Sequence, residues 1–385
     1  MGRHKFLHTY HFVKEVRTMT EADVYEKLRE KISLWPIRTP RTKEVMEILR
    51  ILFTEEEAGF LTHFTAPYQD AETMDRIVER TKRPQEKIRA IVDRLVSRGL
   101  LFRFTSKSDG NVYYSLMPMI PGIFEFYLSS GRDSDEKRKV GELFEKNYVN
   151  GGGLEAGASN YPWARVMPVE KTITVNKEIS VGHLILPFEK MSEFIKTSRN
   201  IAVINCACRT KKKCEHPLET CLVFDYYADF MVERGFGRYL TVKEALELLE
   251  ETEKAGLVHS TINTQTRPQF ICNCCTCACL ILRGLTELHN PRAIAKSNFL
   301  PMRDDKLCNK CKKCVRICPL KANVHHAPHD KEPERIFFFE ERCIGCGLCA
   351  YHCPNEAIKL VKVRDEVPET TPREAFIRVE AERVH

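Results

Sequence analysis

Eight of the seventeen cysteines lie in two copies of one short pattern near the C-terminus. Each copy reads C-x-x-C-x-x-C-x-x-x-C-P. The copies contain Cys308, Cys311, Cys314 and Cys318, and Cys343, Cys346, Cys349 and Cys353. A chain that turns every third residue can place three thiolates around an iron–sulfur cubane, and a fourth comes from elsewhere. Zinc usually takes two C-x-x-C pairs, and disulfides need an oxidising compartment, so both are less favoured. The spacing predicts two [4Fe–4S] clusters.

The stretch from about Phe299 to Val363 resembles the bacterial dicluster ferredoxin family, in which the last cysteine of each run binds the other run's cluster. The resemblance implies that cluster I is held by Cys308, Cys311, Cys314 and Cys353, and cluster II by Cys343, Cys346, Cys349 and Cys318. Gly345 and Gly347 lie between ligands, where a positive φ and a close approach of backbone N–H groups to sulfur are useful.

The other nine cysteines form a second field in the middle of the chain: Cys206, Cys208, Cys214, Cys221, Cys272, Cys274, Cys275, Cys277 and Cys279. Reduced cysteines can simply pack as small hydrophobic residues, but five within eight residues are too dense for that role. We expect at least four of the nine to bind metal, with iron–sulfur favoured over zinc. They could fill two four-ligand sites, or one cluster with several free thiols.

The neighbours of these cysteines give further expectations. If Cys272 to Cys279 formed a strand, Cys275, Cys277 and Cys279 would share one face. Arg209 is placed to offset thiolate charge. We expect His216 and His259 to be ordinary surface or core residues. The arrangement resembles that of uncharacterised anaerobic iron–sulfur proteins with a dicluster ferredoxin tail, and this resemblance implies no particular reaction.

The N-terminal third shows helical patterns over 41–53, 55–64, 71–81 and 85–98, followed by two strands over 100–105 and 112–116. Helices followed by a hairpin resemble the winged helix-turn-helix fold. That resemblance implies a recognition helix over 84–98, with Gln85, Lys87, Arg89, Arg94 and the wing residue Lys107 as possible DNA contacts. Residues 1–150 contain 26 basic and 23 acidic side chains, so DNA binding is possible but not favoured.

Composition limits the class of protein. A chain of 385 residues predicts two or three domains, and its net charge of +7 permits an acidic partner without requiring one. The first residues contain no apolar signal segment, and no 18 uncharged apolar residues are consecutive, so we expect a cytoplasmic protein without membrane insertion. Seventeen cysteines in such a chain favour metal chemistry and an anaerobic host.

These patterns predict an α+β, multidomain chain with a winged-helix N-terminal domain, a Cys-rich α/β middle and a small ferredoxin-like C-terminal domain. The expected divisions are an N-terminal helical extension over 1–40, the winged helix over 41–120, a connecting region over 121–183, the central metal-binding domain over 184–298, and the ferredoxin domain with its tail over 299–385. Thr241 and Glu244 predict a capped helix from 241 to 255 between the two groups of central cysteines.

The predicted function is electron transfer. The chain contains no G-x-G-x-x-G, phosphate-loop or G-x-S-x-G motif, so we expect an electron-transfer component of an oxidoreductase rather than a stand-alone enzyme. The alternatives are a redox-responsive DNA-binding regulator and an oxidoreductase with catalysis at the central field. The basic residues that crowd the first motif predict a redox partner with an acidic docking surface: Lys310, Lys312, Lys313, Arg316 and Lys321. The sequence gives no indication of oligomeric state.

Overall fold

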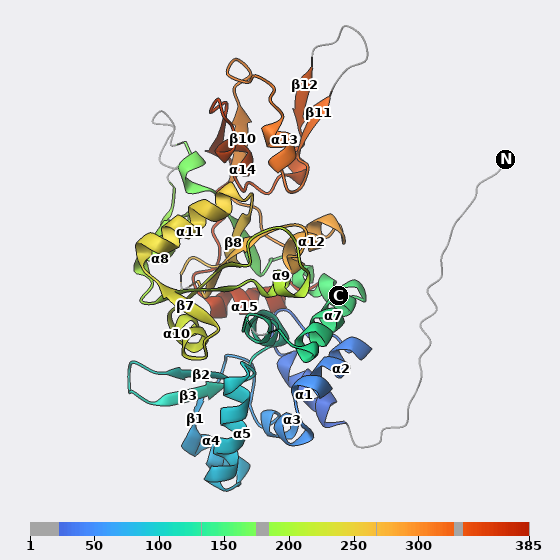
Figure 1. Ribbon diagram of the computed structural model, residues 1–385, viewed down its shortest axis with the longest axis vertical. Helices are drawn as coiled ribbons and strands as arrows, with labels where there is room; N and C mark the ends of the chain where they lie inside the picture. Colours follow the sequence, from blue (N-terminus) through green and yellow to red (C-terminus); the bar gives the residue numbers. More distant parts are fainter. Residues whose placement is uncertain (1–22, 132, 175–184, 267, 327–333, 385) are drawn as a thin grey trace, which may run out of the picture.

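The computed structural model describes residues 23–131, 133–174, 185–266, 268–326 and 334–384. The described part is elongated, with the N-terminal helices at one end, the largest sheet in the middle and the C-terminal strands at the other end (Figure 1). Of the predicted N-terminal extension, residues 1–22 lie outside the described residues, and the remainder contains α1 (Val24–Ile32). No helix in the described segments is long and apolar enough to cross a membrane.

The N-terminal part contains the predicted helices and hairpin. In chain order its elements are α2 (Lys43–Leu52), α3 (Glu55–Leu61), β1 (Glu72–Thr73), α4 (Met74–Thr81), α5 (Gln85–Ser97), β2 (Phe102–Thr105) and β3 (Val112–Ser115). The helix expected from 71 begins only at Met74, because Glu72 and Thr73 pair with β3 and complete a three-stranded sheet in the order β1-β3-β2. Gly99, with a φ of 72°, follows the end of α5.

The segment 121–183, expected to be a connecting region, is built differently. It contains α6 (Phe124–Leu128), the long α7 (Asp135–Val149) and β4 (Ala164–Met167). The start of α7 lies in the segment that we expected to connect domains, and the Ser134 side chain caps this helix by accepting a hydrogen bond from the Lys137 N–H. α7 packs on α2, where the Thr42 hydroxyl donates to Asn147 Oδ1 over 2.8 Å.

The central part is a six-stranded sheet in the order β4-β8-β9-β6-β5-β7, with antiparallel pairing between all neighbours. Its other strands are β5 (Ile201–Asn205), β6 (Glu219–Phe224), β7 (Gly237–Leu240), β8 (Val258–Ile262) and β9 (Phe270–Cys274). Its helices are α8 (Met191–Thr197), α9 (Ala207–Lys211), α10 (Asp225–Glu233), α11 (Val242–Lys254) and α12 (Leu280–Thr286). The predicted Thr241–Glu244 capping box of α11 is confirmed. Because β4 joins this sheet, the central part begins before 184.

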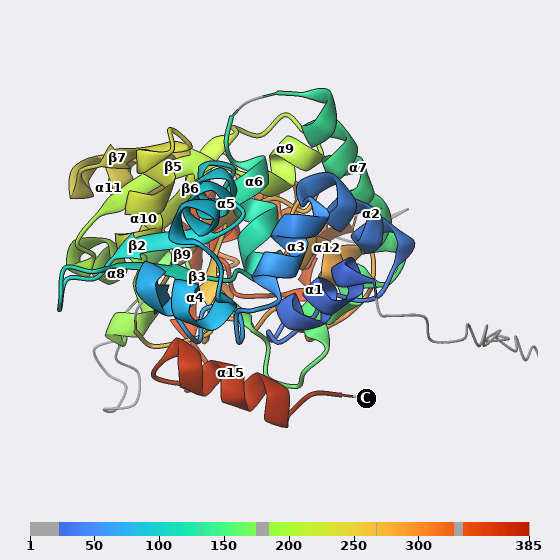
Figure 2. The ribbon, with the colours of Figure 1, turned by 90° about the horizontal axis from the view of Figure 1, so that it is seen from below.

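The C-terminal part contains two small antiparallel sheets, β10 with β13 and β11 with β12. Its elements are β10 (Phe299–Arg303), α13 (Lys313–Ile317), β11 (Asn323–His326), β12 (Arg335–Phe338), α14 (Leu348–Tyr351), β13 (Ile358–Lys362) and α15 (Pro372–Ala381). α15 leaves these sheets and lies along one side of the molecule (Figure 2). There it covers Trp35 and Trp163 with Ala375 and Val379. The chain is thus a mixed helix and sheet fold with several small sheets.

The N-terminal and central parts share one hydrophobic core. Buried side chains from α2, α5, α6 and α7 form a continuous cluster with side chains of β5, β6 and α10. Phe102 of β2, for example, stacks on Tyr227 of α10 with ring centroids 4.9 Å apart. The hairpin is therefore packed against α10 of the central part.

Candidate metal centres

The eight C-terminal cysteines surround two separate hollows. One is lined by Cys308, Cys311, Cys314 and Cys353, and the other by Cys318, Cys343, Cys346 and Cys349. Each hollow combines three cysteines of one run with the last cysteine of the other run. This grouping agrees with the exchange of the last cysteine between the two runs that the ferredoxin resemblance implies. That these residues bind clusters stays a prediction. We call the two hollows the cluster I site and the cluster II site.

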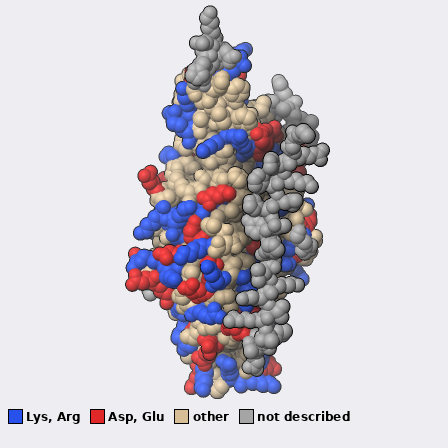
Figure 3. All heavy atoms as spheres, turned by 90° about the vertical axis from the view of Figure 1, so that its right-hand side faces the viewer, with Lys and Arg blue, Asp and Glu red and all other residues tan. Residues whose placement is uncertain are grey.

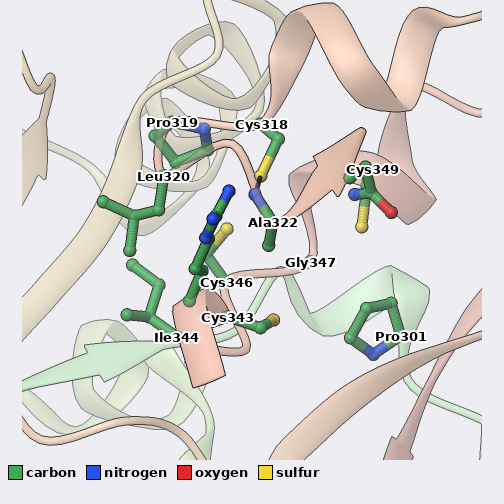
Figure 4. Close-up of a pocket in the computed structure, with 12 residues that line it drawn as sticks. Pro301, Cys318, Pro319, Leu320, Ala322, Cys343, Ile344, Cys346, Gly347 and Cys349 are labelled. Atoms are coloured by element: carbon green, nitrogen blue, oxygen red, sulfur yellow. Dashed lines mark hydrogen bonds between the residues drawn. The ribbon is translucent and has the colours of Figure 1, made fainter. Parts of the chain in front are cut away.

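The cluster II site is lined mainly by sulfurs and apolar side chains, with Asn323 and Arg342 as its polar members. Figure 4 shows Cys318, Cys343, Cys346 and Cys349 around the hollow with Ile344, Leu320 and Pro301 beside them. Burial raises the pKa of the Cys346 thiol to about 12, so this site favours neutral thiols unless a metal stabilises the thiolates. Backbone N–H groups of Ala322 and Gly345 donate to the sulfurs of Cys318 and Cys343 over 3.1 and 3.4 Å. Four thiols with N–H donors fit an iron–sulfur cluster.

The turns between the ligand positions require a left-handed backbone. Gly345 and Gly347 have φ values of 72° and 85°, as expected. A Cβ atom on Gly345 would lie 2.3 Å from the Phe299 carbonyl oxygen. The corresponding positions in the first motif are Lys310 and Lys312, with φ values of 57° and 63°. The two cluster sites thus have the same backbone, and only the second has the residue type that adopts it without strain.

Six of the nine central thiols form a closed ring. Each thiol has two others as side-chain neighbours that shift its pKa, in the order Cys206, Cys208, Cys279, Cys274, Cys272 and Cys221, which returns to Cys206. We call this arrangement the six-thiol ring. Six thiols are more than one cubane needs, and they are also enough to hold two metal ions with shared thiolates.

Neighbouring elements of the central sheet position the ring. Leu222 of β6 pairs with Ile271 of β9, so Cys221 and Cys272 are next in the antiparallel register. Cys274 ends β9. The three remaining thiols come from the starts of two short helices, with Cys206 and Cys208 at α9 and Cys279 as the N-cap residue of α12. The expectation that Cys275, Cys277 and Cys279 share a strand face is wrong, because β9 ends at Cys274 and a turn follows.

The remaining three central cysteines lie close to one another and to a histidine. Cys214, Cys275, Cys277 and His216 place their ligand atoms within 4.8 Å of one another. Cys214 Sγ lies 3.8 Å from Cys275 Sγ, and His216 Nδ1 lies 3.6 Å from Cys214 Sγ and 3.5 Å from Cys277 Sγ. We call this arrangement the compact site. We expected His216 to be an ordinary surface or core residue, but the structure places it among three cysteines. Its position two residues after Cys214 is the sequence signal that could have indicated a ligand.

Arg209 lies between the ring and the compact site. Its side chain is buried, donates to the Asn273 carbonyl oxygen over 3.0 Å and lies 3.8 Å from Cys275 Sγ. Burial opposes its charge, but the neighbouring Cys206 and Cys221 sulfurs raise the pKa of the guanidinium above its usual value. Arg209 therefore supplies positive charge to both sites, as expected. His259 is a core residue, with Nδ1 2.5 Å from Asn273 Oδ1.

A cavity of about 70 Å³ adjoins the ring on the side of the N-terminal part. Cys221 and Cys272 form part of its wall, with Tyr68, Glu125 and Ser129 opposite. The Ser129 and Tyr68 hydroxyl groups have no hydrogen-bond partner among the described residues. Burial raises the pKa of the Glu125 carboxyl group to about 8. The cavity therefore offers two hydroxyl groups without a described partner and one carboxyl group beside two thiols of the ring.

Comparison with known proteins identifies the class of the C-terminal part. Residues 300–354 match the family described as a 4Fe-4S dicluster domain. This segment is therefore an iron–sulfur domain, and the match covers these residues alone. No solved structure matches the chain significantly.

Similar curated proteins carry oxidoreductase names. The chain is 38% identical over 64 residues to the archaeal-type glutamate synthase [NADPH] of Thermotoga sp. (strain RQ2), covering 17% of this chain and 12% of that protein. It is 37% identical over 62 residues to pyruvate synthase subunit PorD of Methanothermobacter marburgensis, covering 16% and 65%. It is 32% identical over 68 residues to NADH-quinone oxidoreductase subunit I of Pelobacter propionicus, covering 16% and 37%. The chain thus spans less than two thirds of each of these relatives.

Proposed function

We propose that this chain is an iron–sulfur electron-transfer protein or subunit, in which clusters I and II exchange single electrons with a centre held by the six-thiol ring. The observation that carries this proposal is the packing of Cys346 in one buried apolar cluster with Cys274 and Cys279. The cluster II site and the ring are therefore neighbours. A [4Fe–4S] cluster, when bound, accepts and gives up one electron at a time.

The residues around the cluster sites suit this role. Cys346 and Cys349 are buried, and Ile344 and Leu348 exclude water from their surroundings. The N–H groups of Ala322 and Gly345 stabilise negative charge on sulfur. No titratable side chain lies among the described residues that line the cluster II site apart from its cysteines and Arg342. The cluster II site is thus shielded from water, and Arg342 is the one basic side chain among the described residues that line it.

The partner is proposed to be a redox protein with an acidic surface. The names of the relatives, a glutamate synthase, a pyruvate synthase subunit and a quinone oxidoreductase subunit, support a place in an oxidoreductase system. Lys310, Lys313 and Arg316 are exposed beside the cluster I site and form no ion pair with a described residue. Cluster I is accordingly the proposed point of contact with the partner.

The test is a count of metal followed by spectroscopy. Protein purified without oxygen should contain at least about eight irons and eight sulfides per chain, the content of two cubanes. A redox titration followed by electron paramagnetic resonance should show two interacting [4Fe–4S] signals and a further signal that Cys272→Ser removes. A stable content below two cubanes, or a Cys272→Ser spectrum identical to that of the unmodified protein, would contradict the proposal.

A second candidate function is catalysis at the ring, favoured by the cavity beside Cys221 and Cys272. An iron held there would be reachable by a small molecule, and Glu125 could transfer a proton. Carbon monoxide should then perturb only the signal that depends on Cys272, and Val223→Phe, which fills the cavity, should abolish the effect. An unperturbed spectrum would leave the ring as an electron carrier.

We propose that the winged-helix part has a structural role, packing against the central part, and does not bind DNA. The described elements follow the order helix, strand, two helices and hairpin, which that fold has. Arg94, a possible DNA contact, is paired with Glu57 over 3.2 Å. Acidic and basic side chains are interspersed at the lower end of the face in Figure 3. A sequence-specific footprint that Arg89→Ala abolishes would favour the regulator instead.

A further inference from the structure

The compact site has the dimensions of a single tetrahedral metal ion. For zinc–sulfur bonds of about 2.3 Å and a zinc–nitrogen bond of about 2.0 Å, a regular tetrahedron has sulfur–sulfur edges of about 3.8 Å and sulfur–nitrogen edges of about 3.5 Å. The Cys214 and Cys275 sulfurs are 3.8 Å apart, and His216 Nδ1 lies 3.6 and 3.5 Å from the Cys214 and Cys277 sulfurs. The Cys277 sulfur also lies within 4.8 Å of the other two sulfurs.

These dimensions exclude a [4Fe–4S] cubane at the compact site, whereas the six-thiol ring is a separate group of cysteines. In a cubane each thiolate binds a different iron, so four ligand atoms must spread further apart than they do around one ion. All four ligand atoms of the compact site lie within 4.8 Å of one another. A disulfide is also absent, because all three cysteines are free and Cys214 and Cys275 are separated by far more than a sulfur–sulfur bond.

The ligand set points to zinc. Three thiolates and one imidazole occupy all four positions of a tetrahedron and leave none open, as in structural zinc sites. Such a site with Zn²⁺ carries one net negative charge, and the buried Arg209 guanidinium lies 3.8 Å from Cys275 Sγ, where it balances that charge.

The surroundings indicate what the ion would do. Residues 212–218, which provide Cys214 and His216, contain no helix or strand, and residues 275–278, which provide Cys275 and Cys277, form a turn. The first segment follows Cys206 and Cys208 of the ring, and the second separates Cys274 from Cys279. An ion bound to both segments would fix the two sides of the ring relative to each other.

We propose that Cys214, His216, Cys275 and Cys277 bind one zinc ion, which clamps the loop 212–218 to the turn 275–278 and holds the six-thiol ring in shape. This ion lies outside the electron path, because zinc has no redox chemistry. The site is independent of the proposed function, since zinc is measured separately from iron.

The experiment uses the full chain, purified without oxygen from cells grown in medium that contains both iron and zinc. Elemental analysis should give about one zinc per chain that resists incubation with EDTA, and zinc-edge X-ray absorption should show about three sulfurs near 2.3 Å and one nitrogen near 2.0 Å. His216→Ala and Cys277→Ser should lower the retained zinc at least about tenfold, whereas His216→Cys should keep it and change the coordination to four sulfurs.

Two controls separate the compact site from the ring and from general damage. His63→Ala, a substitution of an exposed histidine elsewhere, should leave zinc unchanged. Cys272→Ser should lower the iron content and leave zinc in place. Zinc that EDTA removes from the unmodified protein, the same coordination in His216→Ala, or one mononuclear iron in place of zinc would each overturn the assignment.

Discussion

The backbone N–H of Val169 donates a hydrogen bond to the carbonyl oxygen of Cys346 over 3.0 Å. Val169 follows β4 of the central sheet, and Cys346 lines the cluster II site. Two further hydrogen bonds join the same parts, because Ser297 N–H donates to the Ile344 carbonyl over 3.0 Å and His352 Nε2 donates to the Glu253 carbonyl over 2.9 Å. The cluster II site is therefore the hollow fixed to the central part, and the cluster I site is the outer one.

Loss of the outer cluster should block electron entry. Cys311→Ala should lower the iron content by about four atoms per chain and weaken cluster II, since Cys318 of the same run lines that site. Reduction of the central centre by a reduced ferredoxin should then become much slower, because the outer carrier is missing. Stopped-flow absorption during mixing with the donor measures this rate.

The matched variant is Cys343→Ala, which removes a ligand of the inner site. In this variant cluster I should still be reduced by the donor, but the central centre should not. If the central centre were reduced at the normal rate in both variants, electrons would enter it directly and the proposed order of carriers would be wrong.

Glycine at position 310 should stabilise the cluster I site. Lys310 has a φ of 57°, at the position where the second motif has Gly345. A left-handed lysine costs about 1 to 2 kcal/mol, and part of the gain from glycine is lost to the greater freedom of the unfolded chain, so Lys310→Gly should add about 0.5 to 1 kcal/mol. The midpoint of thermal unfolding, measured under argon, should be higher for Lys310→Gly than for the unmodified protein. Arg316→Gly, in α13, is the control and should lower the midpoint, because α13 has a right-handed backbone.

The sequence predicted the C-terminal iron–sulfur domain and the capped start of α11 because the signals for both are local. The spacing of Cys308 to Cys318 and the Thr241 capping box depend only on neighbouring residues. The division of the central cysteines could not be predicted in this way, because it depends on the pairing of β6 with β9, which are about fifty residues apart. The alternating cysteines predict a strand that continues through Cys275, and only the turn after Cys274 directs Cys275 away from the ring and toward Cys214. For the same reason, α7 was taken for a connection: its partner α2 is far away in the sequence.

The stability of the protein should depend on the protonation of Glu125. Burial raises the pKa of its carboxyl group to about 8 in the folded protein, whereas in the unfolded chain it ionises near 4.3. As pH rises between these values, the unfolded chain loses the proton while the folded protein keeps it, so the free energy of unfolding falls. Glu125→Gln cannot ionise and should avoid this loss.

The advantage of Glu125→Gln over the unmodified protein should therefore be small at pH 5, grow up to about pH 8 and then level off at a few kcal/mol. Urea denaturation under argon at several pH values measures it, and Glu142→Gln, on an exposed part of α7, is the control. A difference that does not change between pH 5 and pH 8 would mean that Glu125 ionises normally in the folded protein.

Charge reversal beside cluster I should slow the reaction with the physiological partner. Lys313 and Arg316 are exposed on α13, next to a site lined by Cys311 and Cys314, and positive charge there attracts an acidic partner over roughly one Debye length. Lys313→Glu with Arg316→Glu should lower the association rate about tenfold or more at low salt, and the difference should shrink as salt approaches about 0.5 M, because ions screen the attraction. The control is Lys243→Glu with Lys254→Glu on α11, which changes net charge equally at exposed positions of the central part. Equal slowing by both pairs would indicate that only net charge matters, and a rate that is independent of salt in the unmodified protein would exclude steering by this surface.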